Sequence, residues 1–308
     1  LWVRGKWYTG FDVVRGGATS QDEMDLLLKT LREHHIRYAY VRAGRLPSSG
    51  ELEHLPGRQF CELKDRAQDI VFLPWFAGHA DALPLDDPVW RDRVVQSMGR
   101  LYAAGVEGIH LNLEPIRDGH PGYVELLREI RERFEGDFIV SHATRRVAPL
   151  GSRHALLNDV SWSREFYQRT MQASDQTVLM GYNTMLPSAK LYCAYMGHQT
   201  RRLLDWASEV PGHQVLVGIP AYEHAPGLCD PRVENIPHAL AGVRAALEKR
   251  PSVPACFEGV SIYANWTTTP SEWQQFRSNW PVRSRETVPA TPHNVTRASC
   301  PSRARPLS

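Results

Sequence analysis

The 308-residue sequence has few cysteines, no long apolar run and almost no net charge. Its five cysteines contain no Cys-x-x-Cys pair and suggest no disulfide framework, and no His-Glu-x-x-His segment occurs, so we expect no metal site. No apolar stretch approaches the roughly 20 residues that span a bilayer, which argues against membrane insertion. The formal net charge of +2 gives no electrostatic reason to expect nucleic acid as a partner.

A glycine-rich phosphate loop is also missing. The segment 15–21, "RGGATSQ", follows the first strand candidate but lacks the G-x-G-x-x-G spacing that cradles a dinucleotide. We therefore expect no nucleotide cofactor, and no other cofactor is indicated. This absence also argues against an open, doubly wound sheet, which is the alternative α/β architecture.

Short apolar runs alternate with amphipathic segments along most of the chain. Regular alternation of this kind predicts a parallel sheet covered by helices, and eight units are typical of a (β/α)8 barrel. We predict the α/β class, with a single (β/α)8 TIM barrel over residues 1–283. Residues 284–308 are rich in Pro, Ser and Arg without apolar periodicity, and are predicted to be a disordered tail. Strands are expected at 6–14, 36–43, 69–76, 107–115, 137–143, 176–182, 213–222 and 257–264; helices are expected at 20–35, 87–104, 121–134, 163–173, 191–209, 234–249 and 270–280.

The fourth strand candidate, "EGIHLNLEP", has a polar face. Its residues at 109, 111 and 113 are apolar, whereas His110, Asn112 and Glu114 alternate with them. Alternation on a barrel strand turns one set toward the helices and the other toward the interior. A carboxylate there is unfavourable without partners, so a functional site explains this face better than stability does. A purely structural hydrogen-bond network remains the alternative.

Aromatic and polar side chains also occur near the ends of other expected strands. In a barrel of this type these ends share one rim, where active sites form. Rings beside carboxylates and amides suit sugars, because C–H faces stack on the rings while hydroxyls form hydrogen bonds. We therefore expect the rim to bind an oligo- or polysaccharide through Asp12, Arg42, Trp75, His110, Asn183, Tyr222, Glu223, Tyr263 and Trp266.

The fourth strand resembles the signature D-G-x-D-x-D-x-E of family 18 glycoside hydrolases, the chitinase-like barrels. Three further segments resemble the sixth, seventh and eighth strands of that family in order: "MGYN" at 180–183, "GIPAYE" at 218–223 and "GVSIYAN" at 259–265. The resemblance covers about residues 6–280 and extends to an uncharacterised, glycoside-hydrolase-like branch. It implies that Glu114 is the general acid and that Asn112 and Tyr182 hold a substrate acetamide. The implied substrate is a β-linked, N-acetylglucosamine-containing glycan of the chitin or peptidoglycan type.

The sequence departs from this pattern at four positions. His110 and Asn112 occupy the places of two inner aspartates, Asn183 replaces a third, and Tyr263 replaces a tryptophan. In the family mechanism the substrate's own acetamido oxygen attacks the anomeric carbon. An Asn two residues before the Glu resembles family 85 endo-β-N-acetylglucosaminidases, whose N-x-E pair orients the acetamide with an amide. Asn112 is therefore compatible with the mechanism.

Two alternatives stay open from the sequence. The lost aspartates are compatible with a carbohydrate-binding barrel that has no catalytic activity. A metal-dependent hydrolase would require His110, Glu114 and His142 to converge near the fourth and fifth strands. The implied glycan substrates favour a secreted or cell-envelope location, although no signal segment is visible.

Overall fold

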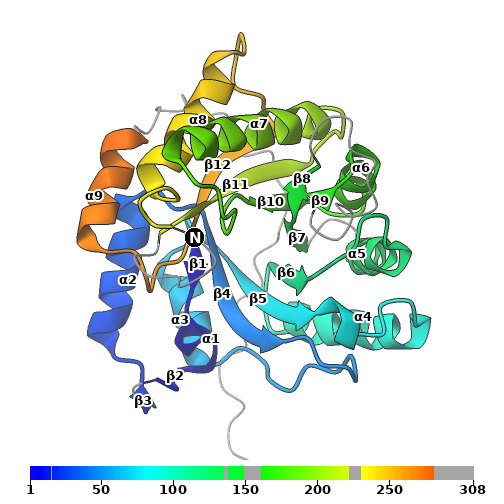
Figure 1. Cartoon of the computed structure of the whole chain (residues 1–308). Helices are drawn as coiled ribbons and strands as arrows, with labels where there is room; N and C mark the ends of the chain where they lie inside the picture. The colour runs from blue at the N-terminus through cyan, green and yellow to red at the C-terminus, as the bar shows by residue number, and fades with distance from the viewer. Residues whose placement is uncertain (15, 135–137, 149–160, 222–229, 281–308) are drawn as a thin grey trace, which may run out of the picture.

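The computed structural model describes residues 1–14, 16–134, 138–148, 161–221 and 230–280. Within these residues, eight parallel strands form one sheet that curls into a barrel (Figure 1). The backbone N–H of Asn265, just after the last strand, donates to the carbonyl of Trp2 on the first at 3.0 Å, which helps to close the ring. The predicted (β/α)8 barrel is confirmed. In sheet order the strands are β1 (Trp2–Val3), β4 (Tyr38–Arg45), β5 (Val71–His79), β6 (Gly108–Glu114), β7 (Ile139–Thr144), β10 (Gln176–Met180), β11 (Gln214–Pro220) and β12 (Phe257–Tyr263).

The helices surround the ring of strands (Figure 1). The predicted capping box at Ser20 is present, because its side chain accepts from the Glu23 N–H while the Glu23 carboxylate accepts from the Ser20 N–H. No helix of the described residues is long and apolar enough to span a bilayer. The helices are α1 (Lys6–Thr9), α2 (Gln21–Glu33), α3 (Arg58–Arg66), α4 (Pro88–Ala103), α5 (Pro121–Arg133), α6 (Arg164–Gln172), α7 (Ala189–Ala207), α8 (Ile236–Glu248) and α9 (Pro270–Asn279).

The first barrel strand differs from the prediction. Residues 6–14 were expected to form it, but the fully buried β1 takes this place. Residues 6–9 form the single turn α1, which ends at Gly10 with a left-handed φ of 83°. Trp7 and Tyr8 on this turn are both buried, and the Tyr8 ring packs against Phe60 at a centroid distance of 5.6 Å. The chain then enters a small hairpin of β2 (Phe11–Asp12) and β3 (Gly17–Ala18) outside the barrel.

Helix α3 was not expected between the second and third strands. Only Phe60 and Leu63 are buried in its nine residues, so its apolar stripe is too short to be distinguished from a loop in the sequence. It carries Cys61, which is disulfide-bonded, contrary to the expectation that the cysteines form no disulfide. Cys193 and Cys256 are free thiols.

Two apolar regions lie on opposite faces of the sheet. The larger region fills the space between strands and helices and includes Ile109, Leu111 and Leu113. The smaller region fills the barrel interior and is rich in aromatic residues, among them Trp2, Tyr40 and Trp75. His110 contacts two of these interior rings, which confirms the predicted alternation along β6.

Candidate active site

A cavity of about 210 Å³ lies at the carboxyl ends of four barrel strands. It is smaller than the roughly 300–1,000 Å³ of typical ligand pockets. This is the end of the barrel where the sequence places the site. The described lining residues are Asn112 and Glu114 from β6, Arg145 and Arg146 directly after β7, Met180, Tyr182 and Asn183 at and after the end of β10, and Tyr263 from β12.

Glu114 is the last residue of β6 and is accessible to solvent from the cavity. Neighbouring protein atoms nevertheless remove much of the water around its carboxyl group, and this desolvation raises its pKa above the ordinary value. Two smaller effects act in the opposite direction: a hydrogen bond from the Asn112 side chain and the charge of Arg145. A carboxyl group with a raised pKa stays protonated to a higher pH than an ordinary one, which suits a general acid.

Asn112 lies one strand pleat below Glu114 and faces the same cavity. Its amide nitrogen is the atom that can donate to the Glu114 carboxylate, since the amide oxygen only accepts. The oxygen Oδ1 is buried and has no hydrogen-bond partner within the described residues. A buried acceptor without a partner is unfavourable, so a hydrogen-bond donor beside this oxygen would stabilise the site.

Aromatic rings form one wall of the cavity. Tyr182 and Tyr263 stack with ring centroids 5.0 Å apart, and Trp2 packs edge-on against Tyr263 at 5.4 Å. The Trp266 ring lies 5.7 Å from that of Tyr263, edge to face, and is not among the residues that line the cavity. Trp2 was missed as a supporting residue because the first strand was expected at 6–14. The apolar opening "LWV" was the only sequence signal for it.

Asn183 lines the cavity from a turn with left-handed backbone, where its φ is 56°. The buried Glu234 fixes this turn, because its Oε1 accepts from the Thr184 and Met185 N–H groups at 2.7 and 3.1 Å. A guanidinium nitrogen of Arg146 approaches the Asn183 carbonyl at 3.5 Å. Sequence reasoning missed Glu234, whose role depends on contacts between distant segments.

Arg145 and Arg146 were also missed. They follow the apolar part of β7 in the segment "SHATRR", where two basic residues after a strand look like an ordinary exposed loop. Both are half-buried in the structure and line the cavity with Glu114. The site is therefore more basic than the sequence indicated.

His110 was expected to bind substrate, but it is fully buried beneath the cavity and does not line it. Its Nδ1 lies 2.8 Å from Ser141 Oγ, which donates to Gln176 Oε1 at 2.8 Å. Tyr40 donates to the same oxygen at 2.7 Å. Burial holds the pKa of His110 well below its ordinary value, so its ring is neutral. His110 thus belongs to a buried hydrogen-bond network, which is the alternative that the sequence left open.

Two other expected rim residues lie elsewhere. Trp75 was placed at the end of its strand, but β5 continues to His79, so Trp75 is a buried residue of the interior, 3% exposed. Arg42 lies above it, with the guanidinium 5.4 Å from the ring centroid. Asp12 belongs to the outer hairpin and forms an ion pair with Lys6 at 3.4 Å. The predictions for Tyr222 and Glu223 lie outside the described residues.

No protein-family model matches the chain, and no curated protein sequence does. Solved structures with a similar backbone include three bacterial enzymes. The Bacillus cereus spore cortex-lytic enzyme SleL is 12% identical, with 90% of this chain and 74% of that one covered at a TM-score of 0.58. A class V chitinase from Pseudomonas fluorescens Pf-5 is 13% identical, with 90% of this chain and 99% of that one covered at a TM-score of 0.57. A family GH18 chitinase from Chromobacterium violaceum is 15% identical, with 89% of this chain and 83% of that one covered at a TM-score of 0.60.

The chain has the fold of the chitinase-like glycoside hydrolase barrels. The fold implied by the sequence resemblance is therefore confirmed. Identities of this size establish the architecture alone, so the activity has to be argued from the cavity itself.

The geometry of this chitinase-like barrel separates the three residues proposed as metal ligands. His142 follows Ser141 on β7 and therefore faces the helix layer, where Tyr123 and Thr177 hydrogen-bond its two ring nitrogens at 3.2 and 3.0 Å. His110 faces the interior. No group of three His, Cys, Asp or Glu residues in the described part of the chain is placed to hold a metal ion. Because His110 faces the barrel interior and His142 faces the helices, the three residues proposed as ligands do not converge.

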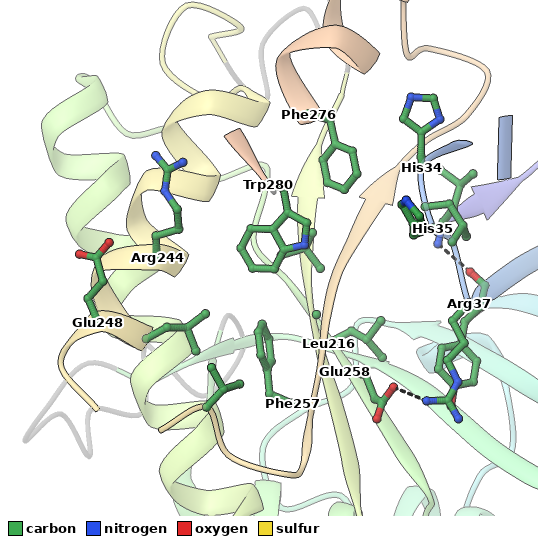
Figure 2. A pocket seen from close by; sticks show the side chains of 17 residues that line it. His34, His35, Arg37, Leu216, Arg244, Glu248, Phe257, Glu258, Phe276 and Trp280 are labelled. Carbon is green, nitrogen blue, oxygen red and sulfur yellow. Dashed lines mark hydrogen bonds and ion pairs between the residues drawn. The ribbon is translucent and has the colours of Figure 1, made fainter. Parts of the chain in front are cut away.

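A larger cavity of about 470 Å³ lies at the opposite end of the chitinase-like barrel (Figure 2). Its walls are mostly apolar, with Phe257 and Trp280 prominent among them. Glu258 on its wall pairs with Arg37 at 2.8 Å. Barrel active sites form at the carboxyl ends of strands, and this cavity touches the amino-terminal parts of β4 and β12. We therefore place the chemistry at the smaller cavity.

Proposed function

We propose that the chain is a glycoside hydrolase that cleaves a β-linked, N-acetylglucosamine-containing glycan. The observation that carries this proposal is the position of Glu114: a carboxyl group with a raised pKa, hydrogen-bonded to Asn112, in an open cavity at the carboxyl ends of the strands. A general acid of this kind contributes about 10²- to 10⁴-fold to a rate.

In the proposed mechanism, protonated Glu114 gives its proton to the glycosidic oxygen as the bond to the anomeric carbon breaks. The acetamido oxygen of the same sugar attacks the anomeric carbon from the other face. Asn112 and Tyr182, which both line the cavity, orient the acetamide. Ionised Glu114 then removes a proton from the water that opens the cyclic intermediate, which restores its protonated form.

The aromatic wall supports a sugar ligand. Tyr182 and Tyr263 line the cavity and present ring surface to the C–H faces of a pyranose. Asn183 adds an amide for hydroxyl groups. Trp266 supports Tyr263 from outside the cavity, so in this proposal it positions a wall residue.

One observation favours a second candidate, a carbohydrate-binding barrel without catalysis. No described lining residue other than Glu114 is acidic. The amide of Asn112 cannot supply negative charge to a cationic cyclic intermediate. Binding of a glycan without any product would favour this candidate.

The test compares Glu114→Gln with the parent chain on chitooligosaccharides and on peptidoglycan, by release of reducing ends. We expect at least a 100-fold lower rate with unchanged thermal unfolding, while calorimetry still detects glycan binding. Glu132→Gln, on the exposed face of α5, is the matched control and should keep full activity. Hydrolysis by Glu114→Gln at the parent rate would contradict the assignment.

A further inference from the structure

The turn that follows β10 carries part of the cavity wall. Tyr182 and Asn183 line the cavity, and the chain continues through Thr184 and Met185 toward α7. Asn183 and Met185 both have left-handed backbone, with φ values of 56° and 57°. Residues other than glycine rarely adopt this conformation, because the Cβ atom is crowded there, so the turn is strained and needs other contacts to hold it.

Glu234 supplies these contacts from a distant part of the sequence. It lies two residues before α8 and is 1% exposed. Its Oε1 accepts from the Thr184 N–H and hydroxyl, both at 2.7 Å, and from the Met185 N–H at 3.1 Å. Two successive backbone N–H groups that point at one anionic oxygen form an anion-binding nest, a feature of such turns. Hydrogen bonds to a carboxylate are stronger than neutral ones, so Glu234 opposes the strain.

Two further contacts hold the same turn. The Tyr192 hydroxyl of α7 donates to the Gly181 carbonyl at 2.7 Å, and a guanidinium nitrogen of Arg146 lies 3.5 Å from the Asn183 carbonyl. Helices α7 and α8 lie side by side on the outside of the barrel (Figure 1). The backbone of residues 181–185 is thus fixed from α7 and from the segment before α8, with both lining residues between the fixed points.

Stability alone does not account for a carboxylate at position 234. The second oxygen, Oε2 of Glu234, is buried and has no hydrogen-bond partner among the described residues. Burial of a carboxylate with an unpaired oxygen lowers the free energy of unfolding, and left-handed backbone at two residues lowers it further. Unfavourable features of this kind gather at functional sites, where they fix a geometry that an unstrained chain would not adopt.

We propose that Glu234 is a positioning residue of the glycan site. It does not line the cavity itself. Its carboxylate holds the left-handed turn, and the turn presents the Asn183 amide and the Tyr182 ring to the sugar. Without this carboxylate the turn relaxes toward ordinary backbone and the glycan loses its contacts with Asn183. The inference rests on the proposed function in that it takes this cavity as the glycan site.

The hydrogen bonds to Glu234 can be measured without a glycan. Amide hydrogen exchange of the 308-residue chain reports on the Thr184 and Met185 N–H groups. Glu234→Ala should speed their exchange by about tenfold or more. Glu272→Ala is the matched control, because the Glu272 carboxylate also accepts from a threonine N–H and hydroxyl, those of Thr269 at 2.8 and 2.9 Å. It should lower the melting temperature and leave the exchange at the turn unchanged.

Glycan binding then tests the effect of the turn on the cavity. Calorimetry uses the Glu114→Gln chain as background, so that turnover does not interfere. The probes are chitotetraose and a tetrasaccharide of alternating N-acetylglucosamine and N-acetylmuramic acid. For the probe that binds more tightly, Glu234→Ala should raise the dissociation constant by about tenfold or more, and Glu272→Ala should leave it unchanged. Glu234→Gln keeps an amide oxygen for the same N–H groups, so it should restore most of the affinity.

A thermodynamic cycle separates positioning from a general loss of stability. Because Glu234 acts through Asn183, Asn183→Ala should weaken binding when Glu234 is present and add little once Glu234 is replaced by alanine. A loss of stability alone would leave the two effects additive. Thr184→Val removes only the hydroxyl donor to Glu234 and replaces Glu234→Ala in the cycle where that variant does not fold. It should raise the dissociation constant by about two- to fivefold.

The outcomes distinguish this inference from the proposed function. Unchanged exchange in Glu234→Ala, unchanged binding in it, or additive effects with Asn183→Ala would overturn the inference, and cleavage by the parent chain would leave the hydrolase standing. Glycan binding that depends on Glu234, with no product from the parent chain on either probe, would do the reverse. Absence of binding to either probe by the Glu114→Gln chain would remove both.

Discussion

Asn112 and Glu114 project from the same face of β6, and the Asn112 side chain hydrogen-bonds the Glu114 carboxyl group. The spacing of two residues on a strand places both on one face of the sheet. The pair is thus fixed by the backbone of a single strand that is buried except at its end. Any chemistry at Glu114 therefore depends on the Asn112 amide, which forms hydrogen bonds but carries no charge.

Substitutions at Asn112 should separate orientation from charge. Asn112→Ala removes the hydrogen bond and the free acceptor, and should lower kcat by about 10²- to 10³-fold, the effect of losing one oriented polar group. Asn112→Asp adds a negative charge that favours a cationic intermediate, so kcat on neutral chitooligosaccharides should exceed that of the parent. Steady-state kinetics on one substrate measures both. A fully active Asn112→Ala variant would show that the pair has no role in catalysis.

The pH dependence should report the protonated form of Glu114. Desolvation raises its pKa, so the acid stays protonated, and the enzyme active, to a higher pH than an ordinary carboxyl group allows; activity is lost as the pH rises through this pKa. Arg145 lowers the same pKa, so Arg145→Gln should move the alkaline decline of kcat/KM upward. Arg128→Gln should not move it. A downward shift in Arg145→Gln would contradict the assignment of the titrating group.

The aromatic wall depends on a glycine behind it. A Cβ at Gly218 would lie 2.7 Å from the Leu179 carbonyl oxygen and 3.2 Å from Tyr182 Cε1. Gly218→Ala should therefore displace the Tyr182 ring, weaken glycan binding severalfold and reduce the free energy of unfolding by about 1–3 kcal/mol.

Gly99→Ala is the matched control for this substitution. Gly99 lies within α4, and apart from its chain neighbours and the nearby backbone of that helix no described atom lies within 4 Å of the added carbon. Alanine should raise the free energy of unfolding there by about 0.5–1 kcal/mol without affecting binding. Thermal unfolding and calorimetry on both variants check the pair. Unchanged binding in Gly218→Ala would show that Tyr182 is not a ligand contact.

A hydrogen-bonded row between sheet and helices should make stability sensitive to acid. Tyr123, His142, Thr177 and His213 follow one another at 3.2, 3.0 and 2.9 Å, and His213 also contacts the Ser174 carbonyl at 3.0 Å. Burial lowers the pKa of His142 to about 3 and that of His213 to about 4. Both are thus neutral in the folded chain at pH 5, whereas unfolded histidines take up protons below about 6.5.

The stability that these histidines contribute is therefore complete above about pH 6.5 and is lost as the pH falls toward 4. Each should remove about 1–2 kcal/mol from the free energy of unfolding between pH 7 and pH 5. Urea unfolding at both values measures the loss. His213→Gln should lose less over this interval than the parent does. An equal loss in both would place the acid sensitivity elsewhere.

The sequence predicted those parts of the site that one strand determines. On β6 the alternation of apolar and polar residues fixes both the strand and the face of Glu114. The sequence-based prediction failed where contacts with other segments determine the local structure. The chain from Lys6 is apolar enough for a strand, but it forms a helical turn whose Tyr8 ring packs against Phe60 of α3, a contact between segments far apart in the sequence. Trp75 was placed at the rim because nothing in "LPWFAGH" marks the strand end.

Glu234 links the cavity to a helix that does not line it. It directly precedes Asn235, whose side chain caps α8. Its carboxylate also accepts a hydrogen bond from the backbone N–H of Thr184, in the turn that follows Asn183. A rigid displacement of the first turn of α8 would therefore be transmitted to the cavity wall. Substitutions at Glu234 or in the first turn of α8 would thus reach the cavity without replacing any lining residue, which makes this junction a target for altering the site.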